Sequence, residues 1–284
     1  MPDLNNHSLA SPGARLSVSS WSLHRTLGRP AFYGPGESLP VATHGHGLKL
    51  LELPAALRRA DIGTLEICHF HLPSTEDAYL AELRAALDES GIELFSLLVD
   101  AGDIVHPQNG PDESAWVASW TETAAALGSR SMRVIAGKQP ATPETLARSA
   151  EVLGELAQRA NDAGVRLMTE NWFALTEEPQ DLRQLIDRLE GAVGLCLDFG
   201  NWDDEDKYGR LEAVADLAES CHAKPRFDEV GLPQRADFVR CLDLLRAVAF
   251  AGPYTLIYSG PLDSEWDGIE LEGVLVAPYI DAEN

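Results

Sequence analysis

The sequence predicts a single (β/α)8 TIM barrel, a fold of the α/β class. Short apolar runs alternate with longer amphipathic ones from about residue 16 to the end of the chain. This alternation indicates parallel strands joined by helices, and eight such strands close into a barrel. The composition also shows no break that would mark a domain boundary. We therefore predict a loose N-terminal tail over residues 1–14 and one barrel over residues 15–284.

Eight segments have the composition of buried strands bounded by turn residues. They are LSVSSWSLH (16–24), TLEICHFHL (64–72), ELFSLLVDAG (93–102), SMRVIAG (131–137), VRLMTENW (165–172), VGLCLDFGN (193–201), SCHAKPR (220–226) and PYTLIYSG (253–260). An open doubly wound sheet is the structural alternative. That fold more often carries a glycine-rich phosphate loop after its first strand, and SSWSLHRTLG is not such a loop. The barrel is therefore favoured.

Helix signals lie between the predicted strands. The segment 74–91 begins with Ser74 or Thr75 as N-cap and ends at Gly91. A second helix begins after its cap, Thr142, and stops at Gly164. These signals support the alternation of strands and helices on which the barrel prediction depends.

One long irregular segment follows the first predicted strand. Residues 28–47, GRPAFYGPGESLPVATHGHG, are rich in glycine and proline. In a barrel this connection lies over the C-terminal face, where active sites form. We predict a lid, with a loose insertion as the alternative.

The charge balance excludes several classes of partner. Lys and Arg number 22 against 45 Asp and Glu, which gives a net charge of −23. Phosphate backbones and anionic membrane surfaces repel such a chain, so we expect neither nucleic acid nor a membrane as partner. The four cysteines form no CxxC pair, and the N-terminus lacks the basic and apolar regions of a signal peptide. A cytoplasmic location is predicted.

Strand periodicity directs three polar residues toward the barrel axis. In GLCLDFGN the apolar residues on either side of Asp198 share the parity that faces the helices, so Asp198 points inward. The same reasoning turns Glu170 inward in VRLMTENW and His222 inward in SCHAKPR. Two carboxylates and an imidazole that converge on one point need a cation between them. The set suits a divalent ion such as Mn²⁺, Mg²⁺, Zn²⁺ or Fe²⁺.

The segments LMTENW, LCLDFGNW and CHAKPRFDEVG, in this order and at these intervals, resemble the xylose isomerase-like TIM-barrel superfamily. That superfamily includes sugar phosphate isomerases/epimerases, inosose dehydratases and endonuclease IV-type nucleases. The resemblance covers nearly the whole chain after the tail. It implies that Glu170, Asp198 and His222 are metal ligands, and that Asn201, where the family often has histidine, binds substrate by hydrogen bonds.

The resemblance also implies a fourth ligand, a glutamate on the eighth strand. The family's last strand commonly reads like GPLSIEYEGP, and this chain reads GPYTLIYSGP, which puts Ile257 in place of that glutamate. In the epimerases of the family the two glutamates act as acid and base on opposite faces of the substrate, so only Glu170 remains as the catalytic group. A three-ligand site is formally neutral and should bind its metal less tightly, so the metal could also be absent.

Other polar residues are assigned to substrate binding. Lys224 and Arg226 share the inward parity of His222 and could hold a hydroxyl, a carboxylate or a phosphate, or pair with a neighbouring acid. His106 follows the third strand on the same face, and Trp172 offers an apolar wall to a sugar ring. Glu66 also has the inward parity and is a potential partner for a ligand, whereas the outward parity of His69 and His71 predicts a packing role for both.

The favoured hypothesis is a metal-assisted isomerase-type enzyme. It would act on a small sugar, sugar phosphate or cyclitol derivative by one-base enediolate or elimination chemistry. The alternative, which Ile257 favours, is a catalytically impaired barrel that serves as a sugar-binding or scaffold protein. Endonuclease IV-type cleavage is opposed by the small number of ligands and by the acidic charge. The sequence leaves the oligomeric state open between a monomer and a homo-oligomer.

Overall fold

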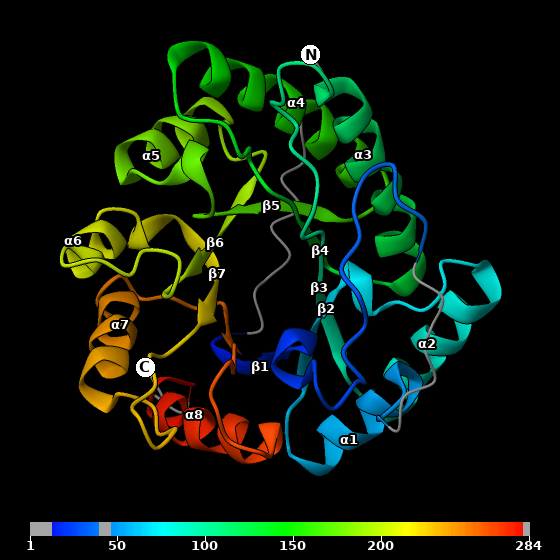
Figure 1. The fold of residues 1–284 in the computed structure, drawn as a ribbon, viewed down its shortest axis with the longest axis vertical. Helices are drawn as coiled ribbons and strands as arrows, with labels where there is room; N and C mark the ends of the chain where they lie inside the picture. Colours follow the sequence, from blue (N-terminus) through cyan, green and yellow to red (C-terminus); the bar gives the residue numbers. More distant parts are fainter. Residues whose placement is uncertain (1–12, 40–46, 281–284) are drawn as a thin grey trace.

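The computed structural model describes residues 13–39 and 47–280, which form a closed barrel with the strand order β1 to β8. Every neighbouring pair of strands is parallel, and β1 closes the barrel against β8. Figure 1 views the barrel from the end at which its strands finish, with the helices arranged around it. The single (β/α)8 barrel is confirmed. Residues 1–12 of the predicted tail and 40–46 of the predicted lid lie outside the described residues.

The eight strands overlap the eight predicted segments but are shorter. The strands are β1 (Arg15–Ser19), β2 (Thr64–Cys68), β3 (Glu93–Leu98), β4 (Ser131–Arg133), β5 (Arg166–Glu170), β6 (Gly194–Asp198), β7 (Ala218–Ala223) and β8 (Pro253–Leu256). The predicted C-terminal ends were wrong because the chain leaves the sheet early. After β1 and β2, for example, it turns into short 3₁₀ helices at Ser20–Leu23 and His69–His71.

The helices form the outer ring of the barrel (Figure 1). They are α1 (Leu53–Arg59), α2 (Asp77–Ser90), α3 (Gly110–Leu127), α4 (Pro143–Asp162), α5 (Pro179–Arg188), α6 (Lys207–Glu212), α7 (Arg235–Ala247) and α8 (Glu265–Ile280). The cap at Thr142 is confirmed, since its side chain accepts a hydrogen bond from the Thr145 amide. The predicted cap of α2 was wrong, because that helix begins after Glu76. Its end at Gly91 is confirmed by a left-handed φ of 64°.

The two faces of the strands differ in chemistry. Outward residues pack against the helices and make up the main hydrophobic core, as Leu65, Leu167 and Leu197 do. Inward residues are largely polar, because alternate strand positions face the barrel axis. Buried residues of this inner set include Ser17, Glu66, Ser96, Arg133, Glu170, Asp198, Ser220, His222 and Thr255. The buried polar side chains of this fold are therefore concentrated around the barrel axis.

Helix α8 contains an unpaired buried acid, Glu272. Its side chain is fully buried, and neither carboxylate oxygen has a hydrogen-bond partner among the described residues. Burial raises the pKa of this carboxyl well above its usual value, which favours its protonated form. In the unfolded chain the Glu272 carboxyl ionises above a pKa of about 4.3, whereas in the folded protein it ionises only at higher pH. The free energy of unfolding therefore falls as the pH rises from the unfolded-state pKa toward the folded-state pKa.

Replacement of Glu272 by Met should therefore stabilise the fold by about 1–3 kcal/mol at neutral pH, since it removes a buried polar group and conserves volume. Thermal unfolding between pH 4 and pH 8 measures the effect, and the advantage over wild type should narrow toward pH 4. Glu272→Gln, which keeps the polar group but cannot ionise, is the control. If Glu272→Gln and wild type lose stability in parallel across this range, the carboxyl is not responsible.

Candidate active site

The three residues predicted to converge do so at the C-terminal ends of neighbouring strands. Glu170 ends β5, Asp198 ends β6 and His222 lies on β7 directly opposite Asp198 in register. The Nδ1 atom of His222 lies 3.4 Å from Asp198 Oδ2 and 3.6 Å from Glu170 Oε1. All three side chains are buried. Three donor atoms from three strands therefore face one point.

The histidine is oriented by a fourth inward residue. His222 Nε2 lies 2.9 Å from Glu66 Oε2 on β2, across the barrel. A carboxylate only accepts, so Nε2 carries the proton and Nδ1 is the atom that faces Asp198 and Glu170. Burial lowers the pKa of His222, but Cys196, Glu170 and Glu66 outweigh burial and raise it well above its usual value. A positive charge, from a proton or a metal ion, is therefore stabilised at Nδ1.

The two carboxylates are held from outside the cluster. Asp198 Oδ1 accepts hydrogen bonds from the amides of Gly200 and Asn201, which leaves Oδ2 toward His222. Glu170 Oε1 accepts a 2.7 Å bond from the Asn201 side chain. Asn171, the residue after Glu170, bonds the backbone of Asp198 through both of its side-chain ends, at 2.7 and 3.0 Å. The ends of β5 and β6 are thereby fixed in one arrangement.

These donors fit a divalent metal ion. A histidine that gives one nitrogen to a carboxylate and presents the other to oxygen ligands has the usual arrangement of a metal-binding imidazole. Cys196 lies two residues before Asp198 on β6, and its thiol is within 4.8 Å of the possible metal-ligating atoms of Glu170 and His222. One divalent ion would also balance the charge of the cluster, which contains four carboxylates and two fixed cations. The carboxylates are Glu66, Asp100, Glu170 and Asp198, and the cations are Arg133 and Lys224.

Arg133, at the end of β4, was missed by the sequence analysis. The residue is 3% exposed, with Nε 3.0 Å from Glu170 Oε2 and Nη2 2.5 Å from Asp100 Oδ1. It also lies over the Trp172 ring at 5.4 Å. The signal was present, because Met132 and Val134 face outward and so direct Arg133 inward. Asp100 follows β3 and has the inward parity of Ser96, so it carried the same signal, but only the fold shows that it meets Arg133.

Ile257 lies immediately after β8 and is 5% exposed. Its neighbours Leu256 and Tyr258 belong to the main hydrophobic core, but Ile257 does not. Thr255 pairs in register with the inward His222, so Ile257, two residues later, shares the inward parity. An apolar side chain therefore stands on the strand position that would supply a further carboxylate.

The other predicted contacts lie around this cluster. Burial raises the pKa of the Asp198 carboxyl, but the hydrogen bond with His222 and the charge of Lys224 outweigh burial, so the pKa is lowered. Lys224 is therefore close to Asp198. Arg226 instead pairs with Asp203 and lies 3.5 Å from Asp237. His106 accepts hydrogen bonds from the amides that precede α3. A substrate role for each of these cations and for His106 stays a prediction.

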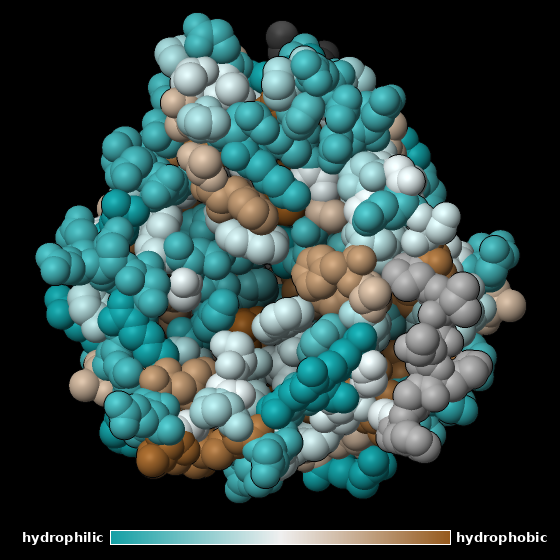
Figure 2. Space-filling model, viewed as in Figure 1, coloured by the Kyte–Doolittle hydropathy of each residue, from teal (hydrophilic) through white to brown (hydrophobic). Residues whose placement is uncertain are grey.

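The surface above the cluster is hollowed and mostly hydrophilic (Figure 2). Aromatic residues stand on the connections around it. Trp172 stacks on Phe173 with ring centroids 4.3 Å apart, and Phe32 stacks on Phe70 at 4.0 Å. Phe32 is 53% exposed. Polar groups beneath and aromatic faces beside a hollow are the surroundings that a sugar-like molecule requires.

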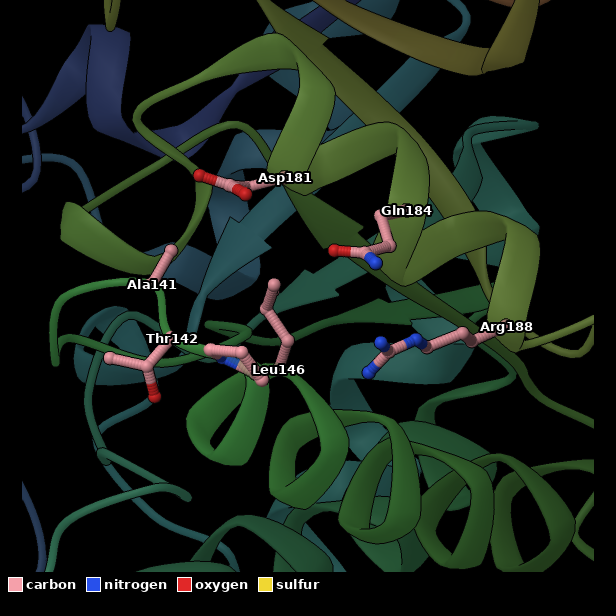
Figure 3. Close-up of a pocket in the computed structure, with 7 residues that line it drawn as sticks. Ala141, Thr142, Leu146, Asp181, Gln184 and Arg188 are labelled. Atoms are coloured by element: carbon pink, nitrogen blue, oxygen red, sulfur yellow. The ribbon is translucent and has the colours of Figure 1, made fainter.

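A separate small cleft lies on the outside of the barrel between α4 and α5 (Figure 3). Asp181, Gln184 and Arg188 from α5 lie across it from Thr142 and Leu146. It shares no residue with the cluster on the barrel axis. Its position on the outer ring separates it from the ends of the strands, where barrel enzymes carry out their chemistry.

The chain belongs to the xylose isomerase-like TIM-barrel family, whose model matches residues 54–268. A search of curated protein sequences returned no match. None of the helices among residues 13–39 and 47–280 combines the length and the apolar character needed to cross a membrane.

Solved structures share the fold at low sequence identity. An L-ribulose 3-epimerase is 16% identical with a TM-score of 0.69, over 95% of this chain and 99% of that one. A xylose isomerase domain protein from Planctomyces limnophilus is 15% identical with a TM-score of 0.68, over 95% and 99%. A xylose isomerase-like TIM barrel protein from Mycobacterium smegmatis, in complex with magnesium, is 17% identical with a TM-score of 0.67, over 93% and 95%.

Proposed function

We propose that the protein is a metal-assisted isomerase-type enzyme that acts on a small polyhydroxylated compound. This proposal rests mainly on the convergence of Glu170, Asp198 and His222, with His222 Nδ1 within 3.6 Å of both carboxylates. Family membership and the sugar epimerase among the solved structures support this class of reaction. The substrate class is a sugar, a sugar phosphate or a cyclitol derivative.

In this proposal Glu170, Asp198 and His222 would hold the ion, with Glu66 fixing the imidazole. A bound divalent ion would polarise the carbonyl of the substrate. Glu170 would remove the proton from the adjacent carbon, because its carboxylate is held at the end of β5 by Asn201 and Arg133. It would deliver this proton to the former carbonyl carbon in an isomerisation, or to the departing hydroxyl in an elimination. Lys224 and the aromatic rings around the hollow would orient the substrate.

Ile257 limits the chemistry to one base. An isoleucine side chain neither accepts nor donates a proton, so a group that acts on the opposite face of the substrate carbon is absent from this position. One-base reactions remain available: aldose–ketose isomerisation through an enediolate, or elimination of water next to a carbonyl. Inversion by two opposed carboxylates would need a second group.

Metal binding and proton exchange test the proposal together. The purified protein, stripped with a chelator, should bind about one Mn²⁺ per chain by calorimetry and unfold at a higher temperature with the ion. The loaded protein should then exchange a carbon-bound proton of a ketose or keto-cyclitol into deuterated water, as followed by NMR. If no ion binds and the unfolding temperature does not change, the metalloenzyme proposal is wrong.

A sugar-binding protein without catalysis is the second candidate, and Ile257 is the observation that favours it. The same experiment separates the two. A binding protein would bind a sugar with or without the ion and leave every carbon-bound proton unexchanged.

A further inference from the structure

Two donors of the Arg133 guanidinium, Nε and Nη1, have no hydrogen-bond partner among the described residues. Nη2 donates a hydrogen bond to Asp100, Nε lies 3.0 Å from Glu170 Oε2 in an ion pair without a hydrogen bond, and the guanidinium carbon lies 5.4 Å from the centroid of the Trp172 ring. Both donors lack a partner although the side chain is only 4% exposed. A buried charged donor without a partner is costly, so its retention calls for a ligand.

We propose that Arg133 is a substrate-binding residue that donates from Nη1 to an oxygen of the substrate beside Glu170. This inference rests on the proposed function and deepens it. A guanidinium is planar and compact, with its donors fixed in direction. Because the guanidinium is small, an oxygen bound at Nη1 would lie near Glu170, although across the guanidinium from it.

The position suits charge that develops during proton removal. When Glu170 takes a proton from a carbon next to a carbonyl, negative charge accumulates on the neighbouring oxygens. A preorganised buried cation stabilises this charge more than the neutral substrate. Asp100 and the Trp172 ring hold Arg133 in place before the reaction, so little reorganisation is needed. Arg133 would therefore stabilise negative charge on a substrate oxygen near Glu170.

Oxalate is a suitable probe because it is small, planar and carries adjacent oxygens, as an enediolate does. Its affinity is measured by calorimetry for protein loaded with Mn²⁺ and freed of excess metal by gel filtration. We expect wild type to bind oxalate and Arg133→Met to bind it at least tenfold more weakly. The Mn²⁺ affinity of the same variant should be equal or higher, because a neighbouring positive charge is removed. A misfolded site would lose both affinities together.

Two further variants define the effect. Arg133→Lys keeps the charge but loses the planar set of directed donors, so it should also lower the affinity for oxalate at least tenfold. This variant replaces Arg133→Met in the test if Arg133→Met does not fold. Arg166→Met is the matched control. Arg166 begins β5 at the opposite end of the barrel and pairs with Glu219, so its loss should leave the oxalate affinity unchanged.

The outcomes separate this inference from the proposed function. If Mn²⁺ binds but oxalate binds equally well to wild type and Arg133→Met, or does not bind to wild type at all, the role of Arg133 is overturned and the metal site stands. Full affinity in Arg133→Lys would also overturn it, because charge without a directed donor would then suffice. Failure of wild type to bind Mn²⁺ would overturn the proposed function and this inference with it.

Discussion

Replacement of Glu170 by Gln is expected to slow proton exchange by about 10²–10⁴-fold, the usual contribution of a positioned general base. The amide has the same shape but cannot take up a proton. The substitution also removes one of the two charged metal ligands that face His222, so the affinity for Mn²⁺ should fall at least ~10-fold. Exchange of a carbon-bound substrate proton into deuterated water is therefore measured by NMR at saturating Mn²⁺, which separates the loss of the base from the loss of the ion.

A glutamate outside the cluster provides the control for this variant. Glu93 lies at the start of β3, at the opposite end of the barrel, where it pairs with Arg15 and Arg130. Glu93→Gln should lower the unfolding temperature and leave the exchange rate at saturating metal unchanged. If Glu170→Gln exchanges at the wild-type rate under the same conditions, another group carries the proton and the assignment of the base is wrong.

The fold was predictable because burial leaves a strong trace in the sequence. Each strand is a short apolar run between turn residues, and the number of runs determines the closure of the barrel. The ends of the strands were not predictable in the same way. Ser19 accepts a hydrogen bond from the Trp21 amide and starts a 3₁₀ turn, so residues that continue the apolar run no longer belong to the sheet.

The same effect explains the two histidines after β2. The strand periodicity assigns His69 and His71 outward positions and hence a packing role. Both lie in a 3₁₀ helix, where that periodicity does not apply. They are buried, His69 Nε2 against the Tyr33 carbonyl and His71 between His24 and Ser20. The packing role agrees with the structure, but the reasoning that led to it was wrong.

Within the site, strand parity directed Glu170, Asp198 and His222 to one point, and their mutual distances agree with that prediction. Arg133 and Cys196 have the same inward parity and were overlooked because neither belongs to the expected ligand set. The Arg133–Asp100 pair joins the end of β4 to the loop after β3, and no local pattern records such a contact. Side chains that act on one another across the barrel therefore need the structure.

Replacement of Ile257 by Glu should make the stability of the protein dependent on metal. Without metal, a further carboxylate would lie buried close to Glu170 and Asp198, at a cost on the order of 3–5 kcal/mol. For a chain of this size, that cost lowers the unfolding temperature by roughly 6–20 °C. Mn²⁺ should restore most of the loss, because the added carboxylate becomes a fourth ligand. Thermal unfolding with chelator and with Mn²⁺ measures both effects.

Ile257→Gln separates charge from shape, since it has the length of glutamate without its charge. Its unfolding temperature should respond to Mn²⁺ no more than that of wild type does. A metal-independent unfolding temperature for Ile257→Glu would show that the side chain after β8 does not reach the cluster. If instead the ion stabilises Ile257→Glu, the added carboxylate also supplies a proton-transfer group opposite Glu170, and inversion at the exchanging carbon should appear beside simple exchange. Gain of inversion by this single change would identify Ile257 as the residue that limits the site to one base.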